Sequence, residues 1–225
     1  MMLKADSISK TYFRRTGSAN YFCAVHPVSL DIPQETVTVL MGRSGSGKTT
    51  LINMLSGILP PSEGKVWLDN TDLFSLKDTD LSRLRNKQIG IVPQGRSAVE
   101  TLTVTENILL PAKLYGRPVT SEHAGRWMES FGIAHLANAM PAELSGGELR
   151  RMAIVRAIVQ QPDFLFADEP TGDLDDENTG IVLSALHSYA HQQQKAVFIV
   201  THEIDVLNYA DRVLKMEDGR IITAD

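Results

Sequence analysis

The chain has 225 residues, 43% of them hydrophobic and 22% charged, a composition of folded globular proteins that excludes a disordered or fibrous chain. This length suits one or two closely joined domains with a buried core. A net charge of −5 offers no basic surface to the phosphates of DNA or RNA, so we expect no nucleic-acid partner.

Cysteine content and the amino terminus indicate the compartment. The single cysteine, Cys23, cannot form an internal disulfide and reads as a small core residue in a reducing cytoplasm. The start, MMLKADSISK, lacks the apolar segment of a signal peptide, and the runs FLFA and VFIV are too short to cross a bilayer. We therefore expect that the chain itself does not span a membrane.

The first part of the chain predicts β-structure followed by one helix. The first forty residues and the stretch GKVWLDNTDL, with a turn at Asp69 and Asn70, indicate antiparallel strands beside a main sheet. TVTVLM (36–41) reads as a strand, and a helix begins near Lys48. Its predicted buried face consists of Leu51, Met54, Leu55, Ile58 and Leu59, and Pro60 and Pro61 are expected to end it.

Residues 103–160 show helical patterns without intervening strands. Thr103 and Glu106 fit a capping box that opens the helix TENILLPAKLY, in which Pro111 should bend the helix or end its first part. The run SEHAGRWMESF predicts a second helix, with Gly132 as the glycine that follows its end.

The last third of the chain alternates between strands and a helix. FLFADEP reads as a strand, 175–193 as a helix and AVFIVTH as the next strand, which predicts βαβ units on a mainly parallel sheet. We therefore expect one α/β domain over residues 1–225. Its core is predicted to cover about 1–93 and 161–225 and to carry the antiparallel β region, with an inserted helical subdomain over about 94–160.

The stretch GRSGSGKTT lies between the strand 36–41 and the following helix, which is the context that the P-loop pattern GxxxxGK[ST] requires. Glycines let consecutive backbone N–H groups converge on a phosphate, and the helix adds its positive end. A flexible glycine turn before a helix is the alternative. The predicted ATP-binding residues are Gly42, Arg43, Ser44, Gly45, Ser46, Gly47, Lys48, Thr49 and Thr50.

Two acidic residues end the strand FLFAD. Asp168 is predicted to hold Mg²⁺ together with the hydroxyl of Thr49, as in P-loop NTPases. Adjacent strand residues point to opposite sides, so Glu169 is free for a different task. We expect it to orient and deprotonate the attacking water. Two surface acids after a strand are the alternative.

The sequence ELSGGELRR has a structural and a functional interpretation. Ser145 and Glu148 fit a capping box for the helix that continues through LRRMAIVRAIVQQ. Two successive glycines weaken a helix start by about 1 kcal/mol each relative to alanine, and a cap has no use for them. Exposed N–H groups at a helix N-terminus favour a second phosphate-recognising surface.

The motif LSGGE resembles the signature motif of ATP-binding-cassette (ABC) ATPases, and its distance upstream of FLFADEP matches the order of motifs in that family. The resemblance covers nearly the whole chain and implies the ABC ATPase fold. It also implies a head-to-tail homodimer in which two ATP molecules are sandwiched. The residues expected to meet the ATP bound by the second copy are Leu144, Ser145, Gly146, Gly147 and Glu148.

Four further positions are assigned by the same resemblance. Gln94, in IVPQG, resembles the glutamine that contacts Mg²⁺ and the attacking water and senses a membrane partner. Asp175, in GDLD, resembles the loop that links the two sites across the dimer. His202 resembles the histidine that contacts the γ-phosphate, although by itself it reads as an ordinary strand-end histidine. Tyr12 is the best match to the aromatic residue that stacks on adenine, with Phe13, Tyr21 and Phe22 as competitors.

The remaining histidines show no metal-ligand grouping in the sequence. His187 and His191 are four residues apart on a predicted helix, but amid SYAHQQQ we expect a solvated face rather than a zinc site. No transition metal is expected, and the predicted cofactors are the ATP and Mg²⁺ indicated by the P-loop and Asp168. The other histidines in question are His26, His123 and His135.

Two departures from the family pattern remove no phosphate ligand: Glu148 replaces a more frequent glutamine, and TGDLD stands where many members have serine and alanine. ADEPTGDLD and TLTVTENILLP resemble the branch of macrolide exporters, lipoprotein-releasing complexes, antimicrobial-peptide resistance pumps and a cell-division ATPase. This implies an ATPase subunit of a bacterial transporter or mechanotransmission complex that powers a separate permease from the cytoplasmic face, for export or extraction of a peptide, lipid or drug. The alternatives are an ATP-gated regulator without solute transport and a soluble ABC protein of repair or translation.

Overall fold

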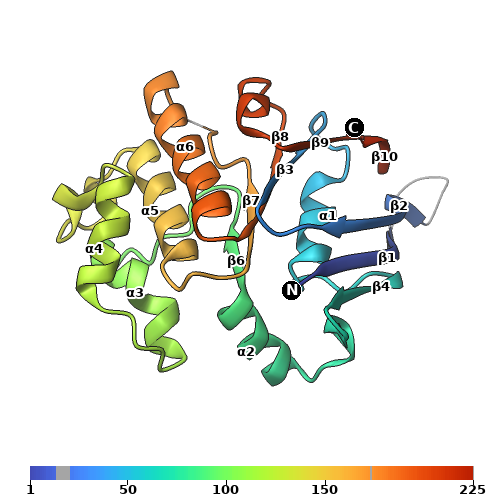
Figure 1. The fold of residues 1–225 in the computed structure, drawn as a ribbon, viewed down its shortest axis with the longest axis horizontal. Coiled ribbons are helices and arrows are strands. Elements are labelled where there is room, and N and C mark those ends of the chain that lie inside the picture. The colour runs from blue at the N-terminus through green and yellow to red at the C-terminus, as the bar shows by residue number, and fades with distance from the viewer. Residues whose placement is uncertain (14–20, 173, 225) are drawn as a thin grey trace.

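The computed structural model describes residues 1–13, 21–172 and 174–224, which form two β-sheets flanked by helices (Figure 1). The smaller sheet has the order β2-β1-β4-β5, and its neighbouring strands are antiparallel. Asp69, between its last two strands, has a positive φ of 50°. The predicted antiparallel β region and its turn are confirmed. The strands are β1 (Leu3–Phe13), β2 (Tyr21–Ile32), β4 (Glu63–Leu68) and β5 (Thr71–Asp72).

The larger sheet has the strand order β10-β9-β3-β8-β7-β6. All its neighbouring strands are parallel except β9 and β10, which confirms the predicted mainly parallel sheet. The sequence patterns do not predict this C-terminal hairpin. The strands are β3 (Thr36–Met41), β6 (Ile89–Val92), β7 (Phe164–Asp168), β8 (Ala196–Thr201), β9 (Arg212–Glu217) and β10 (Arg220–Ala224).

The central strands of the larger sheet are buried on both faces, because their residues alternate between two hydrophobic cores. Phe164 and Phe166 of β7 pack into the core shared with the first helix and the smaller sheet. Leu165 and Ala167 pack into the core formed with the helices of the opposite face. A strand buried on both sides reads as a continuous apolar run, which is why FLFA carries no polar residue.

Three helices, α3, α4 and α5, lie between β6 and β7 in the chain and gather at the end of the molecule opposite the smaller sheet (Figure 1). All residues from 103 to 160 are described, and none of them forms a strand, as predicted. The boundaries of a helical subdomain near 93 and 160 stay a prediction. The elements are α3 (Val104–Leu114), α4 (Ser121–Ser130), η2 (Ala134–Leu136), η3 (Pro141–Glu143) and α5 (Gly146–Ile158).

The predicted start of α3 and end of α4 are confirmed. The backbone N–H of Glu106 donates to Thr103 Oγ1 at 3.3 Å, and Thr103 N donates to Glu106 Oε2 at 2.9 Å, which completes the capping box. Pro111 does not end the helix, which continues to Leu114. Gly132 has a φ of 65°, the left-handed conformation that glycine adopts after a helix.

The helix after the glycine-rich loop, α1 (Lys48–Leu55), ends earlier than the sequence predicts. Gly57 has a φ of 74°, and its N–H donates to Met54 O, while the N–H of Ile58 donates to Asn53 O at 2.9 Å. This is a Schellman motif, so a glycine ends the helix before the prolines at 60 and 61. Ile58 is 48% exposed and does not belong to the buried face predicted for it.

Further helices complete the two layers around the larger sheet. The long helix α6 packs against β3 and β8, and its predicted position is confirmed to within a residue at each end. In the described ranges, no helix combines the length and hydrophobicity that crossing a bilayer requires. The elements are η1 (Leu73–Ser75), α2 (Asp78–Gln88), α6 (Asp176–Gln192) and η4 (Asp205–Tyr209).

Candidate nucleotide-binding site

The candidate site forms where four strands of the larger sheet end. β3, β8, β7 and β6 are parallel neighbours, so their carboxyl ends meet at one edge, where open α/β sheets bind ligands. A cavity of about 310 Å³ opens there. It is lined by Tyr12, Phe22, Ala24, Ser44, Gly45, Gly47, Lys48, Thr49, Thr50, Gln94, Asp168, Glu169 and His202.

The glycine-rich loop presents unpaired backbone donors at this edge. Within the part of the chain that the structure describes, the N–H groups of Gly45, Gly47, Lys48 and Thr49 have no hydrogen-bond acceptor. They precede or begin α1, whose N-terminal end carries a partial positive charge. Unpaired N–H groups at a helix N-terminus match the oxygens of a phosphate.

Backbone crowding explains why glycine is required in this loop. Gly47 has a φ of 100°, and a Cβ there would lie 2.4 Å from Ala24 O. A Cβ on Gly42 would lie 2.6 Å from Met216 O. Gly45 has a φ of 80° but faces open space, so only its backbone conformation favours glycine.

The ammonium group of Lys48 is held beside the cavity by the loop itself. The residue is only 7% exposed, and Nζ donates to Gly42 O at 2.6 Å and to Arg43 O at 3.1 Å. Nζ also lies 3.9 Å from Glu169 Oε1. Phosphate oxygens are acceptors of the same kind with full negative charge, so this lysine fits a nucleotide phosphate.

Thr49 and Asp168, two of the three residues predicted to hold the metal, are brought into contact. Thr49 hydrogen-bonds to the Asp168 carboxylate, which is buried. Burial raises the pKa of Asp168, and the neighbouring Glu169 raises it further. A cation beside this carboxylate would stabilise its charged form. Hydroxyl and carboxylate oxygens are ligands that Mg²⁺ prefers, so this donor set fits Mg²⁺.

Glu169 occupies an uncommon backbone conformation directly after β7. Its φ is 50°, and its N–H donates to Val200 O at 2.9 Å. Its carboxylate accepts from Thr201 Oγ1 at 2.9 Å through Oε2 and lies 2.9 Å from His202 Nδ1 through Oε1. Positive φ at a non-glycine residue persists only where surrounding contacts enforce it, and such residues cluster at functional sites.

His202 and Gln94 both line the cavity. His202 contacts the Glu169 carboxylate, and Gln94 lies in a loop that contacts α5. The hydrogen bond to Glu169 and the negative charge of that carboxylate raise the pKa of His202. Gln94 is exposed just after β6, in a loop that two arginines of α5 hold in place. Arg150 Nη1 donates to Pro93 O, and Arg156 Nη1 donates to the carbonyl of residue 97, both at 2.8 Å.

Two of the four candidate aromatic residues lie at the cavity. Tyr12 and Phe22 are cross-strand partners on β1 and β2, and both line it. Phe13 and Tyr21 instead stack edge to face on each other, with ring centroids 5.6 Å apart, and do not line it. The structure therefore leaves Phe22 beside Tyr12 as an aromatic platform at the cavity.

The signature surface, residues 144–148, lies away from the cavity that the P-loop lines in the same chain. Ser145 caps α5, because Glu148 N donates to Ser145 Oγ at 3.3 Å and Ser145 N donates to Glu148 Oε2 at 2.7 Å. Hydrogen bonds from the backbone N–H and the hydroxyl of Ser145 to the Glu148 carboxylate lower the pKa of Glu148. Leu144 anchors the segment in the core, whereas Ser145 and Gly146 are exposed. Gly147 packs closely, since a Cβ there would lie 2.9 Å from a Leu174 methyl carbon.

Asp175 also lies outside the P-loop cavity and is exposed. Its carboxylate caps α6 by accepting from Asn178 N at 2.8 Å, and hydrogen bonds from Asn178 lower the pKa of Asp175. Arg151 of α5 hydrogen-bonds to Asn178 Oδ1. The helix α5, which carries the signature surface, is therefore connected to the start of α6 through the contact between Arg151 and Asn178.

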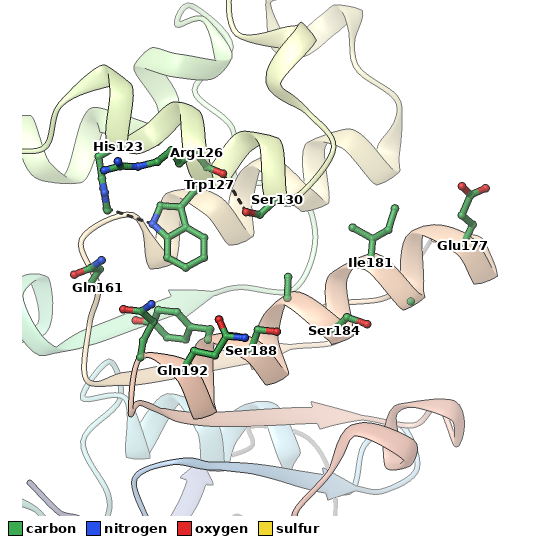
Figure 2. Close-up of a pocket in the computed structure, with 14 residues that line it drawn as sticks. His123, Arg126, Trp127, Ser130, Gln161, Glu177, Ile181, Ser184, Ser188 and Gln192 are labelled. Atoms are coloured by element: carbon green, nitrogen blue, oxygen red, sulfur yellow. Dashed lines mark hydrogen bonds between the residues drawn. The ribbon is translucent and has the colours of Figure 1, made fainter.

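A larger cavity of about 940 Å³ lies between α4 and α6. Figure 2 shows Trp127 of α4 pointing toward α6, where Ser184, Ser188 and Gln192 lie along the helix. None of the predicted site residues lines this cavity, and it has no phosphate-binding loop. The chemistry therefore assigns the candidate site to the smaller cavity at the strand ends.

Sequence reasoning missed Thr201, the residue that holds the Glu169 carboxylate. Asp168 pairs with Val200 in the register between β7 and β8, so the next residues, Glu169 and Thr201, lie side by side. The signal was present in the sequence, because both follow an apolar strand core directly. Recognising it required the knowledge that these two strands are neighbours.

Comparison with known proteins agrees with this geometry. Residues 25–172 match the family described as "ABC transporter". The chain is 34% identical to the lipoprotein-releasing system ATP-binding protein LolD of Leptospira interrogans, over 99% of this chain and 94% of that protein. It is 35% identical to the macrolide export ATP-binding/permease protein MacB of Chlorobaculum tepidum, over 98% of this chain and 34% of that larger protein.

Solved structures of the MJ0796 cassette from Methanocaldococcus jannaschii share the fold. A dimeric form superposes with a TM-score of 0.92 at 31% identity, over 99% of this chain and 97% of that one. A second dimeric form, described as a post-hydrolysis state bound to ADP and Pi, has the same TM-score and coverage at 30% identity. With the family match, the fold and the phosphate-binding edge in agreement, this chain belongs to the ABC transporter family as one of its ATPases.

Proposed function

We propose that this chain hydrolyses Mg-ATP as one half of a head-to-tail homodimer that drives a membrane permease. The supporting observation is the separation of two phosphate-recognising surfaces within one chain. The P-loop lines the cavity, whereas the signature surface exposes Ser145 and Gly146 elsewhere, at the N-terminus of α5. A second copy related by a two-fold axis supplies its signature surface to the first P-loop and receives the same in return.

In this dimer each residue of the site has a distinct task. The loop N–H groups and Lys48 bind the phosphates and stabilise negative charge on them as it shifts during phosphoryl transfer. Tyr12 stacks on the adenine ring. Glu169 accepts a proton from the attacking water, with Thr201 fixing its carboxylate. His202 contacts the γ-phosphate from a position that Glu169 determines.

Thr49, Asp168 and Gln94 are the residues that would hold Mg²⁺. The ion supplies neutralisation of charge on the phosphate oxygens. The protein's contribution is to keep the Asp168 carboxylate and the Thr49 hydroxyl in contact in a buried position, so that little reorganisation accompanies binding.

We further propose that the complex works at the cytoplasmic face of a membrane. Residues 93–96 are exposed beside the cavity, and Arg150 and Arg156 tie this loop to α5. A permease helix docked on residues 93–104 would therefore contact both Gln94 and the helix that carries the signature surface. The names of LolD and MacB favour a lipid-modified protein or an amphiphilic drug as cargo.

Mixing two inactive variants tests the shared site. Lys48→Ala destroys the P-loop half and Ser145→Arg the signature half, so each homodimer has two damaged sites. A heterodimer of the two contains one intact site. Both changes fall in one of its two ATP sites, and the other site combines an unchanged P-loop with an unchanged signature surface. An equimolar mixture should recover about a quarter of the wild-type sites, measured as phosphate release. A double variant with both changes in one chain, mixed with wild type, gives heterodimers with no intact site. A mixture no more active than its components would contradict the shared site.

The permease is tested by reconstitution in lipid vesicles. The cassette should bind vesicles only when its permease is present, and the permease should stimulate ATP hydrolysis. Transport of solute then separates a pump from the alternative, because an ATP-gated regulator would hydrolyse ATP without moving any solute.

A further inference from the structure

Three metal-ligating side chains meet on the surface of the α/β core, outside the nucleotide cavity. His187 and His191 belong to the C-terminal half of α6, and Asp211 directly precedes β9. Their ligand atoms all lie within 4.8 Å of one another. The sequence alone does not bring Asp211 to these histidines, because it lies twenty residues further along the chain.

The two histidines lie close together on one face of α6. Residues four apart lie on the same face of an α-helix, one above the other. The imidazole centroids are 4.3 Å apart, and the ring planes are inclined by 43°. A neutral imidazole nitrogen is the commonest protein ligand for transition metals, so this pair supplies two suitable donors.

Asp211 is a preorganised third ligand. Its backbone N–H donates to Val37 O at 2.9 Å, and its Oδ2 accepts from Val37 N at 2.7 Å. Within the described residues, the hydrogen bond from Val37 N fixes Oδ2 beside His191 Nε2. A carboxylate fixed by backbone groups resembles the outer-sphere support that orients metal ligands in proteins.

The separation between His191 and Asp211 is close to that of two ligands on a tetrahedral ion. His191 Nε2 lies 3.1 Å from Asp211 Oδ2. Two ligand atoms on a tetrahedral zinc ion, with bonds of about 2.0–2.1 Å, are about 3.4 Å apart. The side chains of His191 and Asp211 are 37% and 36% exposed, so an ion can enter and keep a water in its fourth position.

We propose that His187, His191 and Asp211 form a binding site for a divalent transition-metal ion of the zinc class. Two imidazoles and one carboxylate favour such an ion over Mg²⁺ or Ca²⁺, which prefer oxygen ligands. The bound ion joins the last turns of α6 to the position where β9 begins beside β3. It thereby clamps α6, the helix that Asp175 caps, to the central sheet.

Zinc titration of the full-length, nucleotide-free and chelator-treated chain tests the site. Calorimetry should detect one equivalent of zinc whose affinity falls tenfold or more in His187→Ala, His191→Ala and Asp211→Asn. His135→Ala is the matched control, because His135 is also exposed but lies on η2, away from the cluster. Zinc bound elsewhere, including at His202, remains in every variant and cancels in the comparison. Equal affinity in the control and in all three variants would overturn the proposal.

A second measurement identifies the clamp independently of calorimetry. Binding to the folded state alone raises the unfolding temperature, so zinc should raise it in wild type and in His135→Ala. The same addition of zinc should leave the unfolding temperatures of His187→Ala and His191→Ala unchanged. Both variants keep the contacts of Asp211 with Val37, so we expect them to fold without zinc. Circular dichroism checks that they do. A zinc-induced rise of equal size in all proteins would contradict the site.

Discussion

At the scale of single residues, Glu169 connects the groups on which the proposed chemistry depends. Its carboxylate contacts Thr201 and His202 and lies 3.9 Å from Lys48 Nζ. One charge therefore influences both the histidine at the cavity mouth and the phosphate-binding lysine. This coupling makes the charge on Glu169 measurable through its neighbours.

The titration of His202 should report the charge on Glu169. Glu169 raises the pKa of His202, so removing the charge in Glu169→Gln should lower that pKa, measured by NMR of the imidazole. The raised pKa implies stabilisation that is fully present below the unfolded-state pKa of about 6.5 and is lost as pH rises through the folded-state value. Stability of the wild type should therefore decline with rising pH in this window more than that of Glu169→Gln. An unchanged His202 pKa in the variant would contradict the contact.

Nucleotide affinity should depend on Lys48. Loss of a hydrogen bond to a charged group costs about 1.5–3 kcal/mol, so Lys48→Ala should weaken ATP binding about ten- to a hundredfold. Calorimetry measures this constant directly. Lys65→Ala is the control, since Lys65 is exposed and pairs with Asp72 on the smaller sheet, away from the cavity. Unchanged ATP affinity in Lys48→Ala would contradict the phosphate role.

At the scale of secondary-structure elements, α3 and α5 begin with the same capping box but differ in their first helical residues. Thr103 and Ser145 each accept a backbone N–H at 3.3 Å, and each is paired with a glutamate three residues later. Only α5 has two glycines directly after the capping residue. The two helix starts therefore have the same capping contacts, but only the start of α5 is proposed to contact ATP.

This pair separates capping from nucleotide recognition. Thr103→Ala and Ser145→Ala should each lower the free energy of unfolding by about 1 kcal/mol, measured by denaturant titration. Only Ser145→Ala should also weaken ATP-dependent dimerisation and phosphate release. Equal loss of ATPase activity in both variants would indicate that Ser145 acts through helix stability alone.

At the scale of the whole molecule, the two phosphate-recognising surfaces of one chain require a second chain. Glu169→Gln should bind ATP without hydrolysing it and so accumulate as a dimer with saturating Mg-ATP, detected by size exclusion with light scattering. Adding Ser145→Arg to this variant should return it to the monomer, because the bulky, charged side chain prevents the signature surface from contacting the ATP bound by the other chain. A Glu169→Gln chain that stays monomeric with saturating Mg-ATP would count against the shared site.

Local patterns in the sequence determined many of the elements, although not the hairpin of β9 and β10, and most of the candidate site. The P-loop, the carboxylates after FLFA and the capping boxes depend on residues close together in the chain, so their physics is readable from spacing. The early end of α1 at Gly57 was also a local signal, but the two prolines obscured it. The proposed roles of Gln94, Asp175 and His202 came from family resemblance, because single residues in loops carry little pattern of their own.

Tertiary structure decided the contacts that depend on which strands are neighbours. The order β3-β8-β7-β6 brought Thr201 to Glu169, and the antiparallel pairing of β1 and β2 placed Phe22 beside Tyr12 at the cavity. The same applies to Asp211, which reaches His187 and His191 only through the packing of α6 on the sheet. Such contacts join residues far apart in the chain, and their positions follow from strand order and register, which local propensity does not encode.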